Sequence, residues 1–203
     1  DAARHIGHLF EGPITTAALI MGYDFFTLPY DDPARAHKLL GFATASAINY
    51  ARAITARLGS EWKPDTLTIP DDFAGILPPS KFREFVLPYW DRIFVESGCR
   101  TRGLHSELIR PEHLPMLSEV KLDLFDPSVD QYLTPEILRQ QCPCAFQARI
   151  KPWDVRDMSL DELEALYRRT AEQGPTVISF TMRCLEEEAK VRRLLEVARE
   201  LNE

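Results

Sequence analysis

The sequence lacks the features that mark membrane proteins and nucleic-acid-binding proteins. None of its apolar runs approaches the roughly 18 residues needed to cross a bilayer, and its start shows neither the basic nor the apolar part of a signal peptide. The net charge is −7, and acids and bases are mixed along the chain, so there is no basic stripe for a phosphate backbone. These absences predict a cytoplasmic protein that binds neither membranes nor nucleic acids.

Cysteine is also scarce, with four residues among 203. A chain of this length with 45% hydrophobic residues can bury a core without disulfide staples, so reduced thiols are expected. Cys142 and Cys144 form a C-x-C pair, which differs from the C-x-x-C of thioredoxin-like sites and is only a weak sign of a metal. Ordinary structural thiols are the favoured interpretation of this pair.

The sequence does contain short strand patterns followed by helix patterns, and the stretch 66–89 is the clearest case. A β-prone run stops at Pro70, Asp71 and Asp72 follow, and apolar residues at helical spacing come next. Two acids directly after a strand are expected at a ligand-facing mouth. Because consecutive strand residues face opposite ways, we expect only Asp72 to face that mouth, as a catalytic acid.

Six strand patterns predict the fold class. They cover residues 4–11, 66–69, 101–107, 121–125, 145–150 and 176–182. Strands that alternate with helices predict a parallel α/β sheet or a (β/α) barrel, with the chemistry at the carboxyl ends of the strands. A complete barrel typically needs roughly 250 residues. The 203 residues therefore predict a single, incomplete TIM-type barrel domain, 1–203, whose amino-terminal portion is missing.

Several segments, in order, resemble the uroporphyrinogen decarboxylase superfamily, which also includes corrinoid-dependent methyltransferases. They are EGPITTAALIMG, DDPARAHKLLGFATASAINYARA and PDDFAGILPPSKFREFVLPYWDRI. The similarity as a whole, which includes these segments, covers most of the chain. The resemblance implies a barrel, of which this chain holds the later part.

A candidate metal site comes from two of the expected strand ends. His105 and Glu107 are two apart on a strand, so their side chains share a face about 6.6 to 7 Å apart. Cys184 follows the last strand, and strand ends converge in a barrel. One His, one Glu and one Cys match the three protein ligands of a catalytic zinc. The alternative is a hydrogen-bonded acid–base pair of His105 and Glu107, with Cys184 as a buried thiol.

The resemblance bears on the same three residues. In the methyltransferase branch the zinc pattern resembles His-x-Cys with a distant Cys before the last helix. Here Glu107 stands in place of the first Cys, while Cys184 matches the second. The resemblance also implies a corrinoid cofactor carried by a partner protein.

Three more residues are candidates for the same mouth. Glu11, at the end of the first strand pattern, is read as a catalytic acid or, equally, as a first-turn acid on a helix dipole. Arg149 and Trp153 lie near the end of the fifth strand pattern, where they would bind an anionic or planar small-molecule substrate. The alternative for these two is a solvent ion pair and a core Trp.

Three functions follow from these patterns. The favoured one is a zinc-dependent enzyme that moves a methyl group between a small substrate and a corrinoid carrier. The second is a cofactor-free uroporphyrinogen decarboxylase of porphyrin biosynthesis, against which stands the lack of the family's carboxyl-terminal Gly-His-Gly segment. The third is a non-catalytic module that binds a corrinoid protein or closes a homo-oligomer.

Overall fold

The fold is built on one parallel sheet. The computed structural model describes residues 9–202, and in it the strand order follows the sequence, with every neighbouring pair parallel. The strands are β1 (Thr66–Pro70), β2 (Thr101–His105), β3 (Leu124–Asp126), β4 (Ala145–Arg149) and β5 (Val177–Ser179). The other expected strand, 4–11, falls mostly outside the described residues, and its described part, 9–11, is not in a strand.

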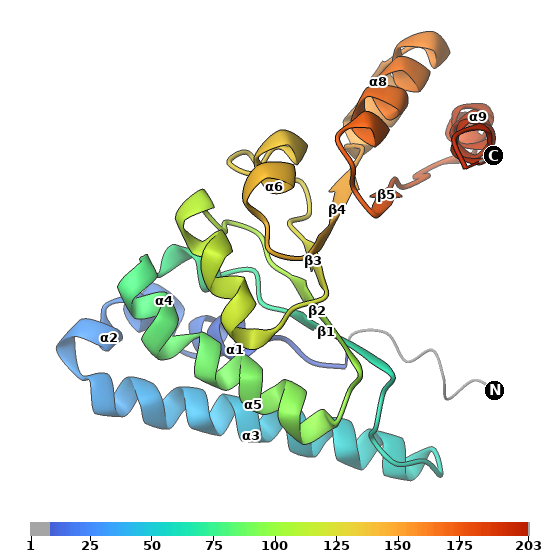
Figure 1. Cartoon of the computed structure of the whole chain (residues 1–203). Coiled ribbons are helices and arrows are strands. Elements are labelled where there is room, and N and C mark those ends of the chain that lie inside the picture. The colour runs from blue at the N-terminus through green and yellow to red at the C-terminus, as the bar shows by residue number, and fades with distance from the viewer. Residues whose placement is uncertain (1–8, 203) are drawn as a thin grey trace.

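Helices alternate with the strands, as expected of repeated (β/α) units (Figure 1). The α-helices are α1 (Pro13–Met21), α2 (Leu28–Asp31), α3 (Pro33–Arg57), α4 (Pro79–Phe85), α5 (Leu87–Ser97), α6 (Pro135–Gln141), α7 (Pro152–Asp157), α8 (Leu160–Glu172) and α9 (Glu188–Glu200). The 3₁₀ helices are η2 (Gly22–Phe26), η3 (Ala74–Ile76), η4 (Pro111–Val120) and η5 (Leu185–Glu187). No helix within residues 9–202 is long and apolar enough to span a bilayer.

Local sequence signals account for where several helices begin. The Asp32 carboxylate accepts a hydrogen bond from Arg35 N at 3.0 Å at the start of α3. Ser159 and Glu162 form a reciprocal capping box at the start of α8. Pro88 lies in the first turn of α5, where its missing N–H costs no helical bond, and α4 ends just before it at Phe85.

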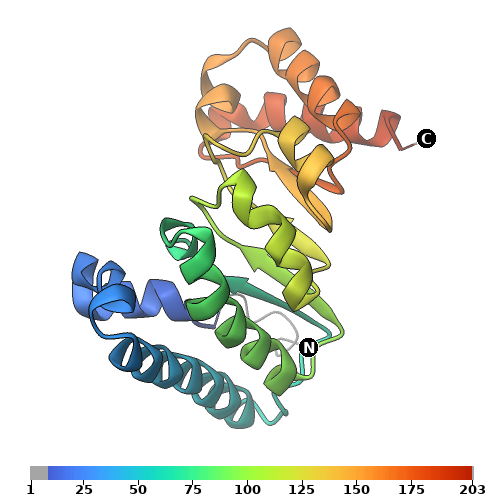
Figure 2. The same ribbon diagram turned by 60° about the vertical axis from the view of Figure 1, so that its left-hand side comes forward.

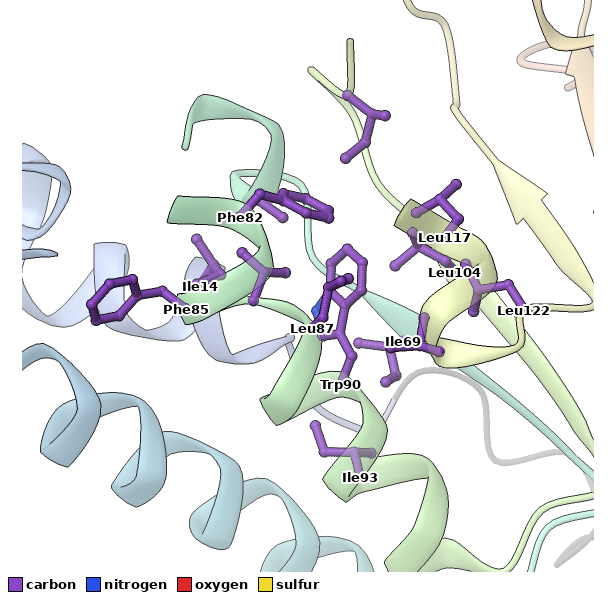
Figure 3. Close-up of a cluster of buried hydrophobic side chains, with 14 of the residues drawn as sticks. Ile14, Ile69, Phe82, Phe85, Leu87, Trp90, Ile93, Leu104, Leu117 and Leu122 are labelled. Atoms are coloured by element: carbon purple, nitrogen blue, oxygen red, sulfur yellow. The ribbon is translucent and has the colours of Figure 1, made fainter. Parts of the chain in front are cut away.

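One face of the sheet is apolar and covered by helices. α3, α4 and α5 gather on one side of β1 and β2, whereas α8 and α9 lie at the other end of the molecule beside β5 (Figures 1 and 2). Ile69 and Leu104 point from the strands into a cluster around Trp90 of α5 (Figure 3). Trp90 and Ile69 are fully buried, so this face supplies much of the hydrophobic stabilisation.

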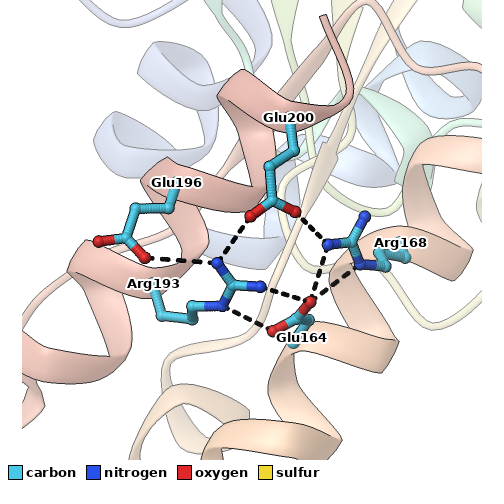
Figure 4. Close-up of polar contacts among 5 residues, drawn as sticks. All are labelled: Glu164, Arg168, Arg193, Glu196 and Glu200. Atoms are coloured by element: carbon cyan, nitrogen blue, oxygen red, sulfur yellow. Dashed lines mark hydrogen bonds and ion pairs between the residues drawn. The ribbon is translucent and has the colours of Figure 1, made fainter. Parts of the chain in front are cut away.

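A second, smaller core holds the carboxyl-terminal helices. It contains Ile150, Val155, Leu163, Tyr167, Leu194 and Val197. On the surface above it, Glu164 of α8 accepts hydrogen bonds from Arg168 and from Arg193 of α9 (Figure 4). Glu200 accepts from the same two arginines, which completes a network across the two helices.

Candidate functional site at the carboxyl ends of the strands

The face of the sheet opposite α3, α4 and α5 carries several polar side chains and, among residues 9–202, lines a pocket of about 420 Å³. The register pairs Pro70 of β1 with His105 of β2, and His105 with Asp126 of β3, so their side chains stand in one row. Because side chains alternate along a strand, this row faces away from Leu104 and the core. The pocket is lined by Thr68, Gly103, Leu104, His105, Leu124, Asp126, Gln147 and Arg149.

His105 lies between two carboxylates. Its Nδ1 is 2.9 Å from Asp126 Oδ2, and its Nε2 is 3.5 Å from Asp72 Oδ1. The hydrogen bond to Asp126 raises the pKa of His105, partial burial opposes this, and the negative charges of Asp126 and Asp72 add to the rise. His105 is therefore biased toward the imidazolium, which is a proton donor.

Asp126 connects His105 to Arg149. Its Oδ2 accepts a hydrogen bond from Arg149 Nη2 at 3.0 Å as well as that from His105, and its Oδ1 accepts from Ser128 N at 2.8 Å. Burial alone would raise the pKa of Asp126, but these donors and the two nearby cations lower it. A carboxylate held ionised here fixes which ring nitrogen of His105 faces the pocket.

Two polar atoms at this site have no hydrogen-bond partner within residues 9–202. They are Arg149 Nε and Asp72 Oδ1, both of which are buried from solvent. A buried donor or acceptor without a partner costs free energy, so each such atom calls for an explanation, such as a bound ligand. Arg149 Nε is suited to donate to a ligand carboxylate, because a guanidinium matches that group in shape and charge.

Asp71 turns the other way and is fully buried. Its carboxylate accepts hydrogen bonds from Thr15 N at 2.7 Å, Trp90 Nε1 at 2.7 Å and Ile14 N at 3.3 Å. Burial raises the pKa of Asp71 to about 6, and these donors hold it from rising further. Gly12 passes so close that an added Cβ would lie 2.3 Å from Asp71 Cγ. Asp71 thus anchors the start of α1 to the end of β1.

The structure places Asp72 on the pocket side, 3.5 Å from His105 Nε2, although β1 ends two residues before it; its catalytic role stays a prediction. Arg149 is also at the pocket, and its role in binding substrate likewise stays a prediction. Trp153 lies in α7, is 47% exposed and does not line this pocket. Glu11 is exposed just before α1 and does not line it either.

The three residues predicted to bind zinc do not come together. Within residues 9–202, no group of three or more His, Cys, Asp or Glu side chains is placed to hold a metal ion. β2 ends at His105, so Glu107 lies in the turn beyond it, where strand alternation no longer sets its direction.

Cys184 lies five residues beyond the end of β5 and is exposed. Among the described residues the sheet is open between β1 and β5, so the ends of β2 and β5 do not converge as they would in a closed barrel. The hydrogen bond with Glu186 raises the pKa of the Cys184 thiol. The predicted ligand set does not fit a metal in this arrangement.

Sequence reasoning missed Asp126 and Gln147 as residues of this pocket. Asp126 ends a strand pattern and is followed by Pro127. The signal that would have found it is the one applied to Asp72, an acid at the carboxyl end of a strand. Gln147 carried no such signal, because it lies in mid-strand and faces the pocket only through the alternation of β4.

Comparison with known proteins identifies relatives of this chain. The family model for "Uroporphyrinogen decarboxylase (URO-D)" matches residues 5–174. A uroporphyrinogen decarboxylase from Nocardia farcinica is 29% identical over 153 residues, which are 74% of this chain and 41% of the relative.

Among solved structures, a methyltransferase from Methanosarcina mazei aligns with a TM-score of 0.72 and 17% identity. The alignment covers 95% of this chain and 58% of that protein, and at this identity it shows a shared fold alone. The chain thus spans well under two thirds of each of these two relatives.

Proposed function

This chain belongs to the uroporphyrinogen decarboxylase family. From that premise we propose that it is part of an enzyme that decarboxylates a small substrate with carboxylate groups, and that the reaction proceeds by proton transfer. The observation that supports the proposal is the row of Asp72, His105, Asp126 and Arg149 at the carboxyl ends of four adjacent strands. This row offers an anion-binding group and a proton donor within one pocket.

Each residue has a distinct part in the proposed reaction. Arg149 holds and orients a substrate carboxylate with those of its N–H groups that do not bond to Asp126. Loss of carbon dioxide from the neighbouring carbon leaves an electron pair there, and His105 Nε2 supplies the proton that takes its place. Asp126 stabilises the imidazolium before the transfer, and Asp72 lies beside the nitrogen that gives up the proton.

The test is carbon dioxide release from uroporphyrinogen, the substrate in the name of the Nocardia relative. His105→Gln should lower the rate by about 10²- to 10⁴-fold, the usual contribution of a positioned acid or base. Arg149→Met should chiefly raise KM. The matched control is Arg100→Met, because Arg100 also pairs with an aspartate, Asp65, but is exposed and precedes β2 at the opposite end of the sheet.

Two results would count against the proposal. One is a wild-type rate of carbon dioxide release that His105→Gln leaves unchanged. The other is an equal loss in Arg149→Met and Arg100→Met, because that would point to a general effect of removing a surface charge. Circular dichroism of each variant separates a folding defect from a catalytic one.

Zinc-dependent methyl transfer with a corrinoid partner protein stays a second prediction. The relatives' names include a methyltransferase, but that likeness extends to the fold alone. Its ligands His105, Glu107 and Cys184 are not together within residues 9–202, so no step through a metal is derived. Zinc analysis of wild type, Cys184→Ser and Cys99→Ser decides the matter, because only a Cys184-dependent zinc content would favour methyl transfer.

A further inference from the structure

The two cysteines of the C-x-C motif come together at the opposite end of the sheet. Cys142 ends α6 and Cys144 directly precedes β4, with exposed Pro143 between them. Their sulfur atoms are 3.7 Å apart, within the range of a sulfur hydrogen bond. Both side chains are half-buried and neither sulfur is in a disulfide, so small reagents can reach them.

The pair does not behave as two independent thiols. The hydrogen bond with the Cys144 thiol lowers the pKa of Cys142, against the effect of burial, and a backbone hydrogen bond at Cys144 contributes in the same direction. The same hydrogen bond raises the pKa of Cys144, and burial and the charges of Cys142 and Asp123 add to the rise. The two shifts run in opposite directions, so Cys142 is the thiol of the pair that gives up its proton more readily.

We propose that Cys142 and Cys144 form a reversible dithiol–disulfide site, in which Cys142 is the attacking sulfur and Cys144 the resolving one. The thiolate of Cys142 attacks a low-molecular-weight disulfide such as glutathione disulfide and releases one glutathione thiolate. Cys144 then loses its proton and attacks the Cys142 sulfur, which releases the second glutathione. Two protein thiols are oxidised and one glutathione disulfide is reduced.

The geometry suits this closure. A disulfide bond is about 2.05 Å long, so the sulfurs have to approach by less than 2 Å. Both belong to one short connection, and exposed Pro143 between them makes no contact in the core. Closure would tie the end of α6 to the start of β4, the strand that carries Gln147 and Arg149 at the pocket.

The test maps every cysteine in one experiment on the wild-type chain. The chain is equilibrated with glutathione and glutathione disulfide at increasing proportions of the disulfide, alkylated and digested with trypsin. The cysteines then fall in three separate peptides, 140–149 with both members of the pair, 93–100 with Cys99 and 184–190 with Cys184. We expect peptide 140–149 to lose two hydrogens and to take up no alkyl group, while 93–100 stays alkylated.

Two variants assign the roles of the two sulfurs. Cys144→Ser keeps a hydrogen-bond donor beside Cys142, and it should form a mixed disulfide with glutathione several-fold faster than Cys142→Ser does. Equal rates in the two variants would overturn the assignment of the attacking sulfur. Two alkyl groups on peptide 140–149 even in pure glutathione disulfide, with glutathione attached at Cys184 only, would overturn the site itself.

Discussion

The two faces of the sheet have opposite chemistry. On one face Ile69, Leu104 and Phe125 are almost completely buried beneath helices, and they exclude water. On the other face His105, Asp126 and Arg149 keep 15–29% of their side chains exposed beside a pocket. Within each short strand, the residues on one side thus stabilise the fold and their neighbours on the other side line the pocket, because alternate side chains point to opposite sides.

The largest expected effect is on the covered face. Phe125→Ala should lower the free energy of unfolding by about 3–5 kcal/mol, because the cavity left by a buried ring is only partly filled by relaxation. Gln147→Ala is the matched change on the open face and should cost far less, since Gln147 is half-buried and, among the described residues, its side chain makes one hydrogen bond, to Ser179 Oγ. Denaturant titration measures the free energy of unfolding of both variants. Similar losses in the two would contradict the different roles of the two faces.

Asp71 and Asp72 are neighbours in the sequence and allow the same comparison between a buried and a pocket-side residue. Asp71→Asn should cost about 1–3 kcal/mol or more, because three N–H donors then face a side chain with one acceptor oxygen and an NH₂ group. Asp72→Asn should cost less, because Asp72 Oδ1 makes no hydrogen bond within residues 9–202 and only a longer contact, of 3.5 Å, with His105 Nε2. Thermal melting of the two variants tests this, and equal melting temperatures would refute it.

On the open face the expected effect is on pH dependence. His105 has a raised pKa in the folded chain, so its contribution to stability is fully present below its unfolded pKa of about 6.5 and is lost as pH rises through the folded value. Asp126→Asn removes the main cause and should move the imidazole titration to lower pH. NMR of the His105 ring measures this shift. In Asp126→Asn, the rate of any decarboxylation that needs the imidazolium should therefore decrease at a lower pH than in the wild type.

A control for that shift is His113, which lies on the covered side of the chain and is almost fully buried. Burial lowers the pKa of His113, whose Nε2 is 2.9 Å from Leu77 O and whose Nδ1 accepts from Arg110 N. Its titration should be unaffected by Asp126→Asn. An equal shift at both histidines would show a general change in the fold rather than the loss of one hydrogen bond.

The smallest effect is expected at the carboxyl-terminal helices, away from both faces. Arg193→Met should lower the free energy of unfolding least of these changes, because ion pairs with this much exposure are screened by water and salt. The loss should shrink at high salt. Arg192→Met is the control, since Arg192 pairs only along its own helix with Glu188. A loss for Arg193→Met that is independent of salt would show that packing, rather than charge, holds α8 to α9.

Much of the fold was predictable from the sequence because it depends on local patterns. The strand patterns that became β1 to β5 alternate apolar residues or form short β-prone runs, and their alternation with helix patterns implied a parallel sheet. Pro88, Asp32 and the Ser159–Glu162 box act within one helical turn, so the sequence by itself determined where those helices begin.

The grouping of the site depended on tertiary structure, because it brings together residues from strands far apart in the sequence. His105, Asp126 and Arg149 meet only through the register of β2, β3 and β4. Cys184 and Glu107 have suitable side chains for zinc, but the extent of β2 and the open sheet keep them from His105. Residue type sets which chemistry a side chain is capable of, whereas strand register and sheet closure decide which side chains share a pocket.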